Sequence, residues 1–134
     1  MSGALPLVTA LYAALLALLA VALGAWVVTL RVRHRVGLGD GGQSRLTRAI
    51  RAHGNLLETA PLALLLLLLA ELTAALPVVG LQATGLALLC GRLLHAAGLA
   101  RSGGASPPRF VGMLLTWLVT VALAGALLLR WLRA

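Results

Sequence analysis

The stretch from Arg51 to Leu72, RAHGNLLETAPLALLLLLLAEL, joins a polar beginning to a long apolar run. Arg51 and Asn55 are four residues apart, and Asn55 and Glu58 are three apart, so on a helix the three side chains share one face. A charged residue near the centre of a membrane helix costs roughly 2.5 to 3.5 kcal/mol on translocon-type scales, so ionisable groups there indicate a functional site. The stretch therefore predicts a membrane helix with a polar site at one end.

The composition is that of an integral membrane protein. Of the 134 residues, 61% are hydrophobic and 10% are charged, and the mean hydropathy is +1.03. In soluble proteins about a quarter of the residues are charged. We expect residues 1–134 to form one all-α integral membrane domain, a four-transmembrane-helix bundle, with no separate soluble catalytic domain.

Four apolar segments are long enough for the roughly 20 residues that a bilayer core requires. They cover about residues 5–30, 55–76, 78–99 and 110–129. We expect Ser44 to be the N-cap of a helix that starts in the first connector and continues into the second span. Gly91 and Gly98 belong to a small-residue face of the third span that permits close helix packing. Glu71 and Gln82 are expected to form a polar contact at the far end.

Arginine supplies all the basic side chains other than histidine, and its distribution predicts the topology. Eleven arginines and three acidic residues give a formal net charge of +8. Six arginines lie in the first connector, two in the second and two at the C-terminus. The positive-inside rule therefore predicts that both connectors are cytoplasmic. Few aromatic residues are available for stacking, and the arginines lie where anionic headgroups explain them, so we do not expect nucleic-acid binding.

This topology brings polar side chains from three spans to one depth at the cytoplasmic end. They are Arg51, Asn55, Glu58, Arg92, His95 and Arg109. Guanidinium groups outnumber carboxylates here, and arginine pairs with carboxylates in a bidentate way, which favours a small anionic ligand. The alternative is that Arg51 or Arg92 pairs with Glu58 to hold helices together, or extends to the headgroups. Scattered histidines and a single cysteine predict no metal site.

Several segments together resemble a known family. They are RAHGNLLETAPLALLLLLLAEL, the upstream RVRHRVGLGDGG, GRLLHAAGL of the third span and PPRFVGM at the start of the fourth. The chain resembles the MAPEG family, the membrane-associated proteins in eicosanoid and glutathione metabolism, and is most similar to its small bacterial members. The resemblance implies a homotrimer in a bacterial inner membrane, with glutathione bound between subunits near the cytoplasmic face. A hydrophobic electrophile would reach the sulfur from the bilayer.

The resemblance also implies roles for single residues. The glutathione-binding positions of the second and third helices would be Arg51, Asn55, Glu58, Arg92 and His95. Arg109 would match the arginine that stabilises the glutathione thiolate in the catalytic members. A nearby guanidinium lowers the pKa of a thiol and so increases the population of the nucleophile. The implied activity is that of a microsomal-type glutathione transferase or peroxidase.

This chain departs from the family pattern at two positions, and these differences disfavour some of the family's activities. Some members carry tyrosine one turn beyond the His95 position, and one branch carries serine after the catalytic arginine, whereas this chain has Leu99 and Phe110. These differences disfavour a prostaglandin or leukotriene synthase. The alternative is a non-catalytic membrane protein that binds glutathione or another small anion at a subunit interface. A third hypothesis, a proton-coupled exporter with one membrane carboxylate, is disfavoured by the uncharged first span.

Overall fold

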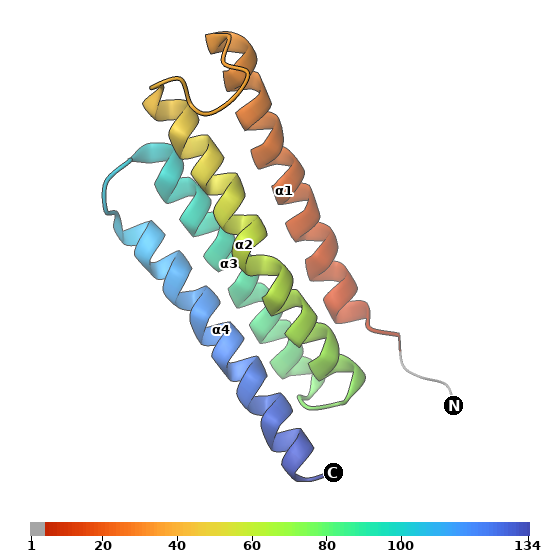
Figure 1. Ribbon diagram of the computed structural model, residues 1–134. Helices are drawn as coiled ribbons and strands as arrows, with labels where there is room; N and C mark the ends of the chain where they lie inside the picture. Colours follow the sequence, from red (N-terminus) through yellow and green to blue (C-terminus); the bar gives the residue numbers. More distant parts are fainter. Residues whose placement is uncertain (1–4) are drawn as a thin grey trace.

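Four long helices form an up-and-down bundle in the computed structural model, which describes residues 5–134 (Figure 1). The helices are α1 (Leu7–His34), α2 (Ser44–Leu72), α3 (Val78–Arg101) and α4 (Pro107–Leu132). All four are long and apolar enough to cross a membrane, which confirms the predicted all-α bundle of four spans. The α1–α2 and α3–α4 connectors lie at one end of the bundle, and the α2–α3 turn and the C-terminus lie at the other (Figure 1).

The second helix differs from the expected segment at both ends. Ser44 is its first helical residue rather than its N-cap, and Gln43 occupies the cap position without a side-chain cap bond. At the other end α2 stops at Leu72, short of the expected residue 76. Ala74 adopts a left-handed conformation with a φ of 50° and Pro77 follows, so the helix does not continue through this turn.

The start of α2 is held by Asp40 instead of a capping serine. One carboxylate oxygen accepts a hydrogen bond from the Thr47 hydroxyl at 2.7 Å, and the other accepts one from the Gly42 N–H at 3.0 Å. The Thr47 hydroxyl first, and then the Gly42 N–H, favour the charged carboxylate and so lower the pKa of Asp40. Gly42 has a φ of +74°, which glycine adopts without strain, so the connector can fold back onto the helix.

Glycines bring α3 and α4 into close contact. A Cβ atom at Gly91 would lie 3.0 Å from the carbonyl oxygen of Gly112, and one at Gly98 would lie 2.9 Å from the backbone nitrogen of Arg109. Larger residues at these positions would force the helices apart. The predicted close packing of the third span is confirmed at Gly91 and Gly98, and it holds the start of α4 against α3.

Two polar side chains at the opposite end of the bundle bond to α1. Glu71 accepts hydrogen bonds from the backbone N–H groups of Val8 and Thr9 at 2.9 and 2.7 Å. The Gln82 side-chain oxygen accepts one from the Tyr12 hydroxyl at 2.8 Å. The expected contact between Glu71 and Gln82 is therefore wrong, because each side chain satisfies a different group of α1, and the free N–H groups of a helix start favour an anionic acceptor.

We expect Gly112→Ala to destabilise the bundle, because the new methyl group would lie 2.7 Å from the backbone nitrogen of His95. Overpacking of this kind costs about 1 to 3 kcal/mol. Gly125→Ala, on the same helix, is the matched control because nothing lies within 4 Å of its Cβ position. Thermal unfolding in detergent measures both variants, and equal melting temperatures would contradict the close α3–α4 packing.

The two ends of the bundle allow a test of the predicted orientation. Leu38 of the first connector is 92% exposed, and the arginine distribution predicts a cytoplasmic location for this connector. In a Cys90→Ala background, Leu38→Cys should react with a membrane-impermeant maleimide only after spheroplasts are lysed. Ala134→Cys, at the other end, should react in intact spheroplasts, and the opposite labelling pattern would reverse the orientation.

Candidate functional site

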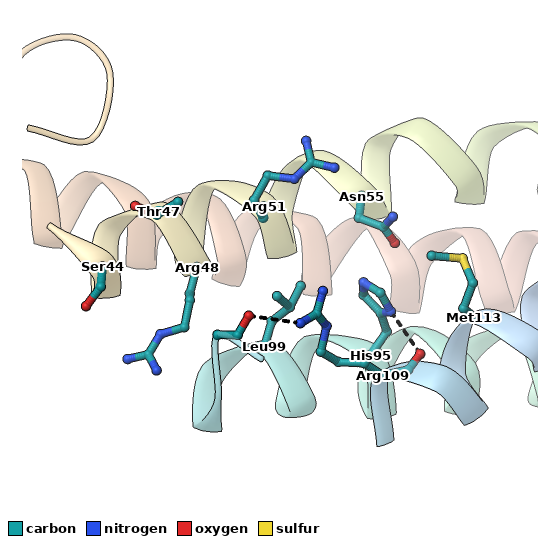
Figure 2. Close-up of a pocket in the computed structure, with 10 residues that line it drawn as sticks. Ser44, Thr47, Arg48, Arg51, Asn55, His95, Leu99, Arg109 and Met113 are labelled. Carbon is teal, nitrogen blue, oxygen red and sulfur yellow. Dashed lines mark hydrogen bonds between the residues drawn. The ribbon is translucent and has the colours of Figure 1, made fainter. Parts of the chain in front are cut away.

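A cavity of about 620 Å³ lies between α2, α3 and α4 at the connector end of the bundle (Figure 2). Its lining residues are Ser44, Thr47, Arg48, Arg51, Asn55, His95, Leu99, Gly103, Arg109 and Met113. Three of these are arginines and none is acidic, so the described lining is positively charged. The volume lies within the usual range of about 300 to 1,000 Å³ for small-molecule sites.

The α2 wall of the cavity is one stripe of a helix. Ser44, Arg48, Arg51 and Asn55 follow one another at intervals of four, three and four residues, which places them on one face. Arg48 extends toward the α3–α4 connector, where its Cδ lies 3.8 Å from the position of a Cβ on Gly103. Arg48 was not among the predicted site residues, although the spacing of Arg51 and Asn55 continues back to it. This helical spacing could have identified Arg48 as a site residue from the sequence alone.

Arg92 is buried beside the cavity and connects three helices. Its side chain is 2% exposed, and it is not part of the cavity lining. Nη1 donates hydrogen bonds to Asn55 Oδ1 at 2.6 Å and to Thr59 Oγ1 at 2.9 Å, while Nη2 donates to the Gly112 carbonyl oxygen at 3.1 Å. Arg92 therefore positions the Asn55 amide. The side-chain oxygen of Asn55 accepts this bond, and the side-chain NH2 group can donate hydrogen bonds to a ligand in the cavity.

Glu58 also lies outside the cavity lining. Its Oε1 is 3.6 Å from Arg51 Nη1, and the two side chains are 57% and 59% exposed. The sequence left open a pairing of Glu58 with Arg51 or Arg92 that holds helices together. The pair that forms is within α2, so it joins no two helices of the chain, and Arg92 bonds to neutral oxygen atoms instead.

Arg109 lies in the first turn of α4, and its side chain reaches back to the α3–α4 connector. Nη1 donates hydrogen bonds to the carbonyl oxygens of Gly104 at 2.6 Å and Gly103 at 3.3 Å, the second of which is drawn in Figure 2. The connector thus holds one positive charge at the edge of the cavity. The guanidinium has further N–H donors that these two bonds do not use.

The structure brings four of the six predicted site residues to one cavity, and they come from three helices. These four are Arg51, Asn55, His95 and Arg109. Leu99 and Met113 add apolar surface that the sequence did not assign to the site. A cavity with cationic walls and an apolar part suits an anionic ligand that carries or meets a hydrophobic group.

We expect Arg92→Lys to destabilise the protein although it keeps the charge. Lysine lacks the planar fork that reaches α2 and α4 together, and a buried acceptor such as Asn55 Oδ1 that loses its donor costs about 1 to 3 kcal/mol. Arg101→Lys, exposed near the end of the same helix, is the matched control. A melting temperature of Arg92→Lys equal to that of this control would show that the three hydrogen bonds contribute nothing.

Comparison with known proteins agrees with this architecture. The model of the MAPEG family matches residues 9–129. The inner membrane protein YecN of Escherichia coli (strain K12) is 46% identical over 92 residues, which cover 69% of this chain and 70% of YecN. YecN of Escherichia coli O6:H1 (strain CFT073) gives the same values. The chain therefore belongs to the MAPEG family, as its sequence predicted.

Proposed function

We propose that this protein binds glutathione in the cavity between α2, α3 and α4, and that it conjugates or reduces hydrophobic electrophiles at the glutathione sulfur. The observation that carries this proposal is the presence of three arginines and no acidic residue in the described lining. Glutathione has two carboxylates, one ammonium group and a thiol, and guanidinium groups bind carboxylates in bidentate geometry. Membership of a family of eicosanoid and glutathione metabolism supports the choice of ligand.

The walls of the cavity would divide the binding and the chemistry between them. Arg48 and Arg51 of α2 would pair with the carboxylates, and the Asn55 amide, which Arg92 positions, would donate hydrogen bonds. Arg109, held by the connector carbonyl groups, is the proposed catalytic residue. A fixed positive charge beside the sulfur stabilises the thiolate, which is the nucleophilic form.

The exposed ion pair on α2 supports self-association, for which we propose a homotrimer. Glu58 lies three residues inside the expected second span, which begins at about residue 55, and more than half of its side chain is exposed. A charged group inside a membrane span is costly when it faces lipid, so a neighbouring subunit would cover it. In that assembly Glu58 could bind the ammonium group of glutathione at the subunit interface, as the family resemblance implies.

The proposed location is a bacterial inner membrane with both arginine-bearing connectors in the cytoplasm. The E. coli relative is named as an inner membrane protein, which supports this membrane. The arginine distribution supports the orientation, and the cytosolic glutathione pool would then lie on the side where the cavity is found. The electrophile would enter from the bilayer toward Leu99 and Met113.

Calorimetric titration of glutathione into the detergent-purified protein tests the binding site. We expect saturable binding that weakens at least about tenfold in Arg51→Ala, because a hydrogen bond to a charged group contributes about 1.5 to 3 kcal/mol. Arg109→Ala should retain binding but lose turnover of chlorodinitrobenzene. Arg45→Ala is the matched control, since Arg45 is exposed on the same helix and does not line the cavity.

The outcomes separate the possible functions. No saturable binding of millimolar glutathione to the wild type would reject the proposal. Binding without turnover in the wild type would favour the alternative, a non-catalytic protein that holds glutathione or another small anion. Equal losses of binding in Arg51→Ala and Arg45→Ala would show that the net charge of α2 matters and the cavity does not.

A further inference from the structure

His95 presents a ring nitrogen that the proposed glutathione chemistry leaves without a role. Its side chain is 6% exposed, and Nδ1 lies 3.3 Å from the carbonyl oxygen of Arg109. A carbonyl oxygen can only accept a hydrogen bond, so this contact places the ring proton on Nδ1. In the neutral ring, Nε2 is then a proton acceptor.

The acceptor nitrogen is directed into the cavity. Figure 2 shows the ring nitrogen that is not bonded to Arg109 on the side of the cavity where Arg51 and Asn55 lie. Within residues 5–134, Nε2 has no hydrogen-bond partner. It is also not fully buried, so a ligand can reach it. The backbone of His95 is also fixed, because a Cβ on Gly112 would lie only 2.7 Å from its nitrogen. The lone pair is therefore held in place and accessible to a ligand.

His95 stands where two cavities meet. A second cavity of about 390 Å³ adjoins the first, and His95, Arg109 and Met113 line both. The second cavity extends to Phe110, whose side chain is 69% exposed on α4. A thiol bound beside Arg109 would thus lie between the cationic cavity and a cavity with an apolar rim, which is where it would meet an electrophile.

No other described residue of the cationic cavity can take a proton from the thiol near neutral pH. Arginine remains protonated and only donates, and the remaining lining groups are hydroxyl, amide, thioether and apolar side chains. The charged groups close enough to act electrostatically on the ring are Arg92 of α3, Arg109 of α4 and Arg51 of α2. Arg109 can stabilise a thiolate, but the proton must go elsewhere.

We propose, on the basis of the proposed glutathione site, that His95 is a second catalytic residue and that its Nε2 removes the thiol proton. The S–H bond breaks, the proton joins Nε2, and the thiolate pairs with Arg109. With chlorodinitrobenzene the sulfur bonds to the aryl carbon, and chloride leaves with the electron pair of the C–Cl bond. The imidazolium releases its proton to water, which restores the neutral ring and leaves conjugate, chloride and a proton as products.

The test is the pH profile of turnover in His95→Gln. We expect turnover near neutral pH, measured at glutathione concentrations that saturate each protein, to fall about 10²-fold, the lower range for loss of a general base. The difference from the wild type should shrink as the pH rises through the pKa of the bound thiol, which Arg109 lowers from its ordinary value of about 8.5, because the thiol then ionises without a base. A loss that is equal at every pH would assign His95 a purely structural role and overturn the proposal.

Chemical rescue provides a second readout. Added imidazole should restore part of the turnover of His95→Ala, because it can occupy the vacated volume and accept the proton, and it should not restore Arg109→Ala. His53→Gln is the matched control, since His53 contacts the Gly24 position of α1 and does not line the cavity. If imidazole does not rescue His95→Ala, and the pH profile of His95→Gln has the same shape as that of the wild type, then His95 is not the general base.

Failure of this inference is distinguishable from failure of the proposed function. If the wild type binds and turns over glutathione and only Arg109→Ala is inactive, the site stands and the role of His95 is wrong. If the wild type neither binds nor turns over glutathione, the proposed function is wrong, and so is the role of His95 that depends on it.

Discussion

The burial of one guanidinium group determines the arrangement of the polar end of this bundle. Arg92 is enclosed among apolar helices, where an unpaired charge would be very costly, so its N–H groups require fixed acceptors. The acceptors are oxygen atoms of α2 and α4, with Asn55 at 2.6 Å and the Gly112 carbonyl at 3.1 Å. The bonds of Nη1 and Nη2, with Nε left without a partner among the described residues, fix the positions of α2 and α4 relative to α3, and the cavity lies between these helices.

The chemistry of the site depends on backbone atoms as much as on side chains. The Gly112 carbonyl is available to Arg92 because Gly91 lets α4 approach α3 closely. The same approach brings the Arg109 carbonyl within 3.3 Å of His95, which sets the proton on one ring nitrogen and leaves the other for the cavity. Gly91 and Gly112 thus influence the orientation of the His95 imidazole, because they set how closely α3 and α4 approach.

The sequence predicted the fold because a membrane restricts the choice to helices whose backbone groups bond internally. It also predicted Arg51 and Asn55 as a pair, because they are neighbours on one helix. It could not predict that Arg92 bonds Asn55, since the two are 37 residues apart and their meeting depends on the relative rotation of two helices. The exposure of Glu58 could not be predicted either, because it depends on what covers the outer face of α2.

The placement of the acidic residues decides what kind of ligand the bundle can accept. Glu71 is committed to the N–H groups at the start of α1, and Glu58 faces outward beside Arg51. A proton-coupled exporter needs a carboxylate inside the bundle that can load and release protons, and neither of these lines the described cavity. Arg51 is paired with Glu58, but Arg48 and Arg109 have no carboxylate partner among the described residues, so charge that enters with a ligand can neutralise them. This arrangement favours an anionic ligand, and among the described lining residues only His95 is able to accept a proton near neutral pH.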